Sequence, residues 1–343
     1  MAGPVGSRPD LKRTLARNTY ASGSIVETIL PRDHGLKRLW CRLRVDMTVS
    51  SGASVITDNP MSLVKSIRIS GTVSGAGSTT IKQASLTMLY WAAFFKRGTK
   101  PYRAQLASAG NQSNTILEVM VPIDFYATNL AEPGASILPC YAYKDLVAQV
   151  QWGTTTDLCA SGVTINSAYI DFTTHELPGL TETEYARNIE TMMTYPATTT
   201  GTDLQIFDLP LSGAYKSILL RETSSGAATR PGLNLLTGKV RVDLNGQSNI
   251  RLLDAAAIRQ ANAWSHGDGP SPVLTDAAGT RALSITVVEE NPLTYLYWID
   301  FAENMGVDGL IDASRLSSFK LYGDITTGGT SPIIEGLINR FEA

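Results

Sequence analysis

The sequence predicts an all-β protein with a few short helices, built as two tandem β-sandwiches. Three observations carry this prediction: strand-like alternation along most of the chain, turn-rich segments between the alternating runs, and one order of elements that occurs twice. A chain of 343 residues also exceeds the length that one hydrophobic core usually supports. We therefore expect two domains of about 150 to 170 residues.

Composition limits the classes of function. The chain is 43% hydrophobic and 17% charged, which is typical of a folded globular protein whose surface is partly covered in an assembly. A formal net charge of −2 excludes the basic field of a protein that coats nucleic acid, and no sequence-specific nucleic acid partner is expected. The cysteines Cys41, Cys140 and Cys159 form no CxxC pair and are predicted to be buried free thiols. Residues 1–24 contain no apolar signal segment, so we expect synthesis in a reducing host cytoplasm.

The clearest strand is Leu39–Val49, where apolar residues alternate with polar ones. One face of this strand is predicted to be buried, and the other to be wet or at an interface. Further runs with a period of two, separated by turn-rich segments, are Ser24–Leu30, Ser66–Ser70, Thr115–Val121, Asp145–Trp152, Val163–Phe172, Lys239–Leu244, Ala282–Val288 and Leu293–Phe301.

Two segments break the alternation. Ile81–Phe95 and Ile250–Trp264 place apolar residues at helical spacing, end on an aromatic residue, and begin 169 positions apart. We expect two helices, each packed on a sheet.

The order of elements indicates a duplication. "VPIDF" at Val121 recurs as "YWIDF" at Tyr297, 176 positions later. In each half a strand leads to a helix and then to three further strands, at a spacing that drifts between 168 and 176 while few residues are identical. The join lies in the Pro-Gly-containing segment Glu176–Glu190. The predicted domains are a basic N-terminal arm (1–17), a first sandwich (18–180), a linker (181–185) and a second sandwich (186–343).

The size of each half selects the type of sandwich. Units of about 155 to 165 residues with about eight strands suit a jelly roll better than an immunoglobulin sandwich, which needs about 100 residues. The sequence thus predicts two tandem eight-stranded jelly rolls.

Three features of the sequence resemble those of one protein family. The paired "PIDF" and "WIDF" segments, the helix in each half and a closing "FKLYGDITTGG…IIEGLINRF" hairpin resemble the double-jelly-roll major capsid proteins of tailless icosahedral viruses, in particular membrane-containing bacteriophages of tectivirus and corticovirus type. The resemblance covers nearly the whole chain and is architectural. It implies a homotrimer with a pseudo-hexagonal outline, located in the virion shell and contacting neighbouring capsomers and minor capsid and vertex proteins. It implies no enzymatic activity and no cofactor.

The N-terminal arm is locally basic, with Arg8, Lys12, Arg13 and Arg17 against a single acid, Asp10. Asp10 is predicted to cap a short helix that begins at Leu11. In the membrane-containing members of the family such an arm lies at the inner surface of the shell. The resemblance therefore implies contact with an anionic internal membrane or, as an alternative, with the genome; a solvated, disordered end is equally compatible with the sequence.

The chain lacks recognisable catalytic or metal-binding motifs. His34, His175 and His266 share no metal-ligand spacing, and "HGDG" after Ser265 is typical of a turn. "GDITTGGT" after Tyr322 lacks the lysine of a phosphate loop and indicates a hairpin turn. The adjacent pair Glu289 and Glu290 would point to opposite faces of a strand.

Two other classes of function compete with a shell protein. Tandem β-sandwiches also occur in phage tail or fibre proteins and in carbohydrate-binding modules. An enzyme of the cupin type would need clustered histidines and carboxylates inside its barrel, and three scattered histidines argue against it.

Overall fold

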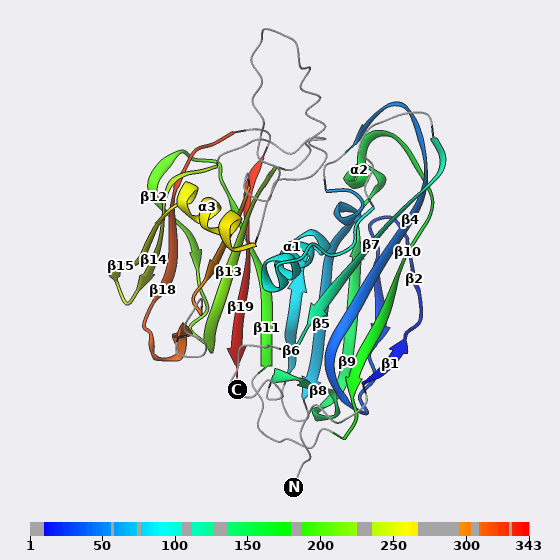
Figure 1. Ribbon diagram of the computed structural model, residues 1–343, viewed down its shortest axis with the longest axis horizontal. Coiled ribbons are helices and arrows are strands. Elements are labelled where there is room, and N and C mark those ends of the chain that lie inside the picture. Colours follow the sequence, from blue (N-terminus) through cyan, green and yellow to red (C-terminus); the bar gives the residue numbers. More distant parts are fainter. Residues whose placement is uncertain are drawn as a thin grey trace.

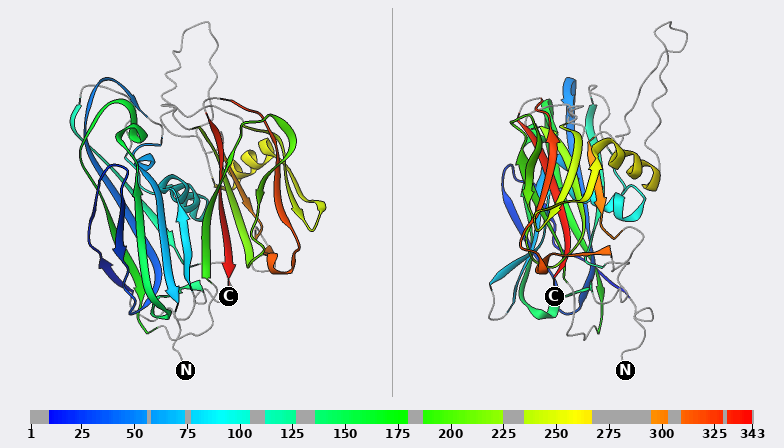
Figure 2. Two further views of the ribbon diagram at one scale, coloured as in Figure 1. Left: turned by 180° about the vertical axis from the view of Figure 1, so that it is seen from behind. Right: turned by 90° about the vertical axis from the view of Figure 1, so that its left-hand side faces the viewer.

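The computed structural model describes residues 10–55, 58–73, 77–104, 112–126, 136–179, 187–224, 235–266, 295–302, 309–328 and 331–342. These residues form two β-sandwiches that stand side by side with their strands roughly aligned (Figure 1). Two helices of equal length, α1 (Leu86–Arg97) and α3 (Ala255–His266), project from the same side of the molecule (Figure 2). A single-turn helix, α2 (Thr155–Leu158), precedes the last strand of the first sandwich.

The first sandwich consists of two antiparallel sheets. Sheet I contains, in spatial order, β1 (Leu11–Thr14) with β2 (Asn18–Thr19), then β10 (Cys159–Leu177), β4 (Gly35–Val55) and β7 (Gln112–Asp124), and the short β8 (Leu138–Pro139) pairs with β4. Sheet II contains β3 (Ile25–Ile29), β9 (Tyr143–Trp152), β5 (Val64–Val73) and β6 (Ser78–Ala84).

The second sandwich has the same construction. Sheet III contains β11 (Arg187–Pro196), β19 (Pro332–Glu342), β13 (Ala214–Ser224) and β16 (Leu296–Asp300), and the short β17 (Ile311–Asp312) pairs with β13. Sheet IV contains β12 (Gly201–Asp208), β18 (Phe319–Ile325), β14 (Leu236–Leu244) and β15 (Gln247–Asp254).

The two sandwiches have one topology. We number the main strands of the described residues along the chain within each sandwich, taking β1 and β2 as one strand and leaving out the short β8 and β17. With this numbering, sheets I and III both have the order 1-8-3-6, and sheets II and IV both have the order 2-7-4-5. A helix follows the fifth strand in both. This arrangement is a jelly roll, and it confirms the prediction of two tandem eight-stranded units.

The repeated Ile-Asp-Phe segments occupy equivalent places. The backbone N–H of Phe125 donates to the carbonyl of Lys37 at 3.1 Å, and that of Phe301 donates to the carbonyl of Lys216 at 2.8 Å. In both sandwiches this bond ties the end of the sixth strand to the start of the third. The duplication predicted from the order of elements is therefore present down to individual backbone contacts.

Both helices begin later than the sequence predicts. Residues 81–84 and 250–254 are strand, in β6 and β15, so the predicted starts at Ile81 and Ile250 are wrong. Ser85 marks the first true start, since its hydroxyl accepts a hydrogen bond from the Met88 N–H at 3.2 Å. Asp254 marks the second, accepting from Ala256 N–H at 2.8 Å. Such side chains satisfy backbone donors that the first helical turn leaves unpaired.

The predicted closing hairpin is also wrong. β18 lies in sheet IV and β19 in sheet III, so the segment between them crosses from one sheet of the sandwich to the other instead of turning back within one sheet. The predicted linker 181–185, the predicted strand Ala282–Val288 and the pair Glu289 and Glu290 lie outside the described residues.

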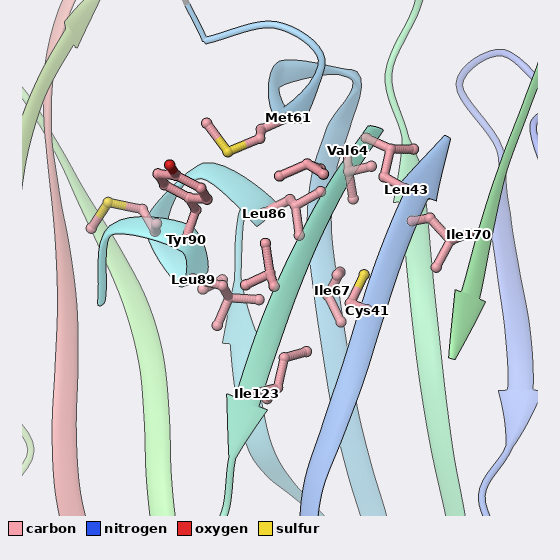
Figure 3. Packing of buried hydrophobic residues seen from close by; sticks show 14 of the residues in the cluster. Cys41, Leu43, Met61, Val64, Ile67, Leu86, Leu89, Tyr90, Ile123 and Ile170 are labelled. Atoms are coloured by element: carbon pink, nitrogen blue, oxygen red, sulfur yellow. The ribbon is translucent and has the colours of Figure 1, made fainter. Parts of the chain in front are cut away.

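The first core confirms the alternation predicted for Leu39–Val49. The inward residues of β4 are at most 2% exposed, and they are Leu39, Cys41, Leu43, Val45, Met47 and Val49. Figure 3 shows α1 closing one side of this core, with Leu86 and Leu89 facing the strands that carry Cys41, Ile67 and Ile123. Cys41, Cys140 and Cys159 are all buried and unbridged, as predicted. None of the described helices combines the length and the hydropathy needed to cross a bilayer.

Candidate assembly surfaces and the junction between the sandwiches

The two sandwiches are joined edge to edge by β6 and β11. These strands run parallel, with Lys82 opposite Glu190 and Gln83 opposite Thr191. Figure 1 shows them adjacent in the middle of the molecule. Sheets II and III are therefore one continuous sheet, and neither of these two edges is left open to pair with another chain.

A buried carboxylate lies at the centre of this junction. Glu190 on β11 accepts a hydrogen bond from Lys82 Nζ at 3.0 Å, from Asn339 Nδ2 of β19 at 2.7 Å, and from Lys96 Nζ in the last turn of α1. The side chains of Lys82 and Glu190 are only 1% and 3% exposed. One carboxylate thus connects two elements of the first sandwich to two of the second.

The charge state of the cluster follows from its surroundings. Burial acts to raise the pKa of Glu190, but the charges and hydrogen bonds of Lys82 and Lys96 outweigh it and hold that pKa well below the usual range. Burial lowers the pKa of Lys82 to about 8, although Glu190 opposes this shift. At neutral pH the carboxylate is ionised, and Lys82 still carries most of its charge.

A second ionic contact ties the sandwiches together. Arg221 on β13 donates to Asp58, in the segment that follows β4, and to Glu335 Oε2 on β19 at 2.6 Å. Burial acts to lower the pKa of Arg221, but the two carboxylates outweigh it and raise that pKa above its usual value. One guanidinium thus faces two carboxylates, so each of the three ions has an opposite charge beside it, although Arg221 Nε makes no hydrogen bond.

Sheet III is buried on both faces. Along β13, Ile218 and Leu220 belong to the second core, whereas Leu219 between them belongs to the first core. β16 shows the same division, since Tyr297 faces the second core and Trp298 the first. The outer face of sheet III is therefore part of the hydrophobic core around α1.

Aromatic residues of α1 make this contact. Phe95 stacks on Trp298 with 5.5 Å between ring centroids and 3° between ring planes. Trp91 meets Tyr295 edge to face at 6.3 Å. His266, at the end of α3, lies edge-on to Phe95 at 5.2 Å. Such pairs add about 1 kcal/mol each beyond the burial of their area.

The outer face of sheet I is different, because it is charged and uncovered by the described residues. Arg42 donates to Glu118 Oε1 at 2.7 Å, and Arg38 donates to Asp124 Oδ1 at 2.5 Å. We call the outward side chains of β10, β4 and β7 the charged face. It is the polar side of the strand Leu39–Val49 that the sequence placed in water or at an interface.

Part of the predicted basic arm is a strand of the first sandwich. Leu11–Thr14 is the strand β1, paired with β10, so the predicted helix capped by Asp10 is wrong. The first jelly roll accordingly begins at or before Leu11, and the predicted boundary at residue 18 falls within its first strand. Pairing with β10 satisfies the backbone of this segment without a helix.

The four basic residues of the predicted arm differ in exposure and in their ion pairs. Arg8 lies outside the described residues, and Lys12 is exposed on β1. Arg13 forms ion pairs with Asp33 at 3.4 Å and with Glu176 at 3.2 Å. Arg17 makes two hydrogen bonds to Asp171, at 2.9 and 3.1 Å, and its guanidinium carbon lies 3.6 Å from the ring centroid of Tyr169. Two of the four charges are thus already paired with carboxylates.

The histidines do not form a site. His34 and His175 lie in or beside sheet I, and His266 lies at the end of α3. Among the described residues no group of three or more histidine, cysteine or acidic side chains is arranged to hold a metal ion. The rest of the "HGDG" segment lies outside the described residues.

Sequence reasoning missed the residues of the junction. Lys82 was assigned to a helix, and its polar neighbours Thr80 and Gln83 give no local signal that this lysine is buried and paired. Glu190 was assigned to the end of the linker region. Its partners Lys96 and Asn339 are 94 and 149 positions away, a separation that no local pattern reveals.

Known structures share this fold. The major capsid protein of Sulfolobus turreted icosahedral virus superposes with a TM-score of 0.71 at 14% identity, covering 97% of both chains. The major capsid protein P2 of bacteriophage PM2 gives 0.58 at 12% identity, again over 97% of both chains. The Faustovirus major capsid protein gives 0.57 at 9% identity, over 100% of this chain and 91% of that one. No family model and no curated protein matches the sequence. The chain has the double-jelly-roll fold that it shares with these proteins.

The buried carboxylate yields a stability prediction. Replacing Glu190 with Gln leaves Lys82 and Lys96 buried without a counter-charge, so the free energy of unfolding should fall by about 3 kcal/mol at pH 7. The folded pKa of Glu190 lies below its unfolded value, so its contribution is present above about pH 4.3 and is lost as the pH falls. The difference between wild type and E190Q should therefore shrink below pH 4, by up to about 1.4 kcal/mol per pH unit.

Urea unfolding of both proteins between pH 3 and pH 7 measures this difference. Glu27→Gln, on the exposed strand β3, is the matched control and should change stability by less than about 0.5 kcal/mol. A Glu190→Gln protein as stable as the control at pH 7 would mean that the cluster does not hold the junction.

Proposed function

We propose that this chain is the major capsid protein of an icosahedral virion and that it assembles as a homotrimer of pseudo-hexagonal outline. The observation that carries the proposal is the duplication: two jelly rolls of one strand order stand side by side, and solved structures described as major capsid proteins share this arrangement over almost the full chain. No enzymatic activity forms part of this function.

Duplication has a geometric use in a shell. A ring of three two-domain chains presents six similar units, so it can tile the faces of an icosahedron as a hexagon does. Contacts between neighbouring tiles repeat many times, and each one can therefore be weak. The proposal places the protein in the virion shell, in contact with neighbouring capsomers and with minor capsid and vertex proteins.

The N-terminal segment is proposed to contact an anionic internal membrane. Arg13 and Arg17 are paired with carboxylates, so the proposal now rests on Arg8 and Lys12. Basic residues near an anionic bilayer contribute about 1 kcal/mol each. A bacteriophage origin likewise stays a prediction.

Electron microscopy tests the assembly directly. Purified protein, or particles that contain it, should show flat trimers with a pseudo-hexagonal outline. Elongated fibres, or a monomer that binds glycans on an array, would instead favour the tail-fibre or carbohydrate-binding alternatives and would contradict the shell function.

Vesicle flotation tests the membrane contact. The double variant Arg8→Ala, Lys12→Ala should bind anionic vesicles about 30-fold more weakly than wild type at low salt, because two basic residues worth about 1 kcal/mol each are lost. Lys320→Ala, on strand β18 of the second sandwich, is the control for removal of one charge elsewhere. Equal binding of wild type and the double variant would remove the lipid role from this segment.

A further inference from the structure

The contact between the sandwiches is directional, and the chain makes it once. The first sandwich contributes its helix and the edge of its fifth strand, which are α1 and β6. The second contributes the outer face of sheet III and the edge of its first strand, β11. We call the surface formed by the helix and the fifth strand the donor side of a sandwich. The acceptor side is the outer face of its 1-8-3-6 sheet together with the edge of its first strand. These two names describe the contact between sandwiches and not hydrogen bonds.

One donor side and one acceptor side remain unused. β15, the fifth strand of the second sandwich, pairs only with β14 among the described strands, and β1 pairs only with β10. The charged face of sheet I is the acceptor face that corresponds to the buried outer face of sheet III, which carries Leu219 and Trp298 as well as the ion pair of Arg221 and Glu335. α3 is the donor helix that corresponds to α1, and residues on its outward side are exposed, namely Ala256, Ala257, Gln260 and Ala261.

We propose that the charged face of one copy binds α3 and the β15 edge of a second copy. This inference rests on the homotrimer proposed above and assigns the surfaces that form it. The contact is head-to-tail, so each copy uses its own acceptor side for one neighbour and its donor side for the other. Such a contact closes into a ring when the rotation permits.

The chemistry of the two surfaces is compatible. Two residues of α1 contact sheet III, Trp91 and Phe95. By position in the helix they correspond to Gln260 and Trp264 of α3, so one aromatic position is kept and the other is polar. The charged face is internally balanced, because Arg42 is paired with Glu118 and Arg17 with Asp171. A partner with small and polar side chains can cover paired charges without leaving an ion uncompensated.

An exposed apolar residue gives this face an anchor. Ile116 on β7 is 46% exposed and shares the face with Glu118, two positions further along the strand. Tyr102, in a segment bonded to β7 through the Met120 N–H at 3.0 Å, is 64% exposed. A few side chains that the partner buries fully supply most of the binding energy of an interface.

The difference between the two contacts has a consequence for assembly. The contact within the chain buries aromatic rings and cannot open without exposing them. The contact between chains is more polar, so it can form after each chain has folded.

Two single variants and two matched controls test the proposal. Gln260→Arg on α3 and Ile116→Arg on β7 each place an unpaired charge in the contact, and each should raise the dissociation constant of the trimer about tenfold or more. Gln205→Arg on β12 and Ile29→Arg on β3 make the same substitutions at exposed positions outside it, and should leave the constant unchanged. Sedimentation velocity over a dilution series measures all five proteins, and circular dichroism confirms that each is folded.

The outcomes separate this inference from the function on which it rests. Folded variants that dissociate while both controls remain trimeric support the assigned surfaces. A wild type that forms trimers together with variants that also do so overturns the surfaces and leaves the shell function standing. A wild type that is monomeric at every concentration contradicts both.

Discussion

The structure rests on the burial of sheet III, which is covered on both of its faces. One face completes the core of the second sandwich, and the other is covered by α1 and the first core. An uncovered outer face would expose Trp298 and Leu219 to water, so we expect the second sandwich to lose stability without the first one beside it. Each unit therefore has a complete strand topology of its own, but the stability of the second unit depends on its contact with the first.

Charges at the junction select how the units meet. Apolar packing alone tolerates sliding, whereas Glu190 is satisfied only when Lys82, Lys96 and Asn339 reach it together. Its low pKa means that the ionised form is present at all but strongly acidic pH. The cluster therefore fixes the register of β6 against β11, the kind of specificity for which buried polar groups are retained in some proteins.

The sequence allowed the architecture to be predicted because its signals are local and repeated. Alternation identified β4 and its buried face, and the repeated order of elements identified the two units despite low identity. The helix starts failed because Ile81 and Ala84 lie three positions apart, a helical spacing, although both belong to strand β6. The caps at Ser85 and Asp254 mark where the helices begin. Arg17 was taken as a free charge because its partner, Asp171, is 154 positions away.

Two-faced burial was visible in the sequence but was not recognised. The segment "YLYWI" before Asp300 has no alternation, and such an unbroken apolar run is typical of a strand covered on both sides. The corresponding strand β7 keeps its alternation, with Glu118 facing outward. The contrast between the duplicated strands thus reports which copy of the sheet is covered within the chain.

Differential scanning calorimetry of the protein in its monomeric form measures whether the two sandwiches unfold together. If the second sandwich depends on the first, the chain should unfold in a single transition whose calorimetric and van't Hoff enthalpies agree. Two resolved transitions, or a calorimetric enthalpy about twice the van't Hoff value, would show that the sandwiches unfold independently and would contradict the account.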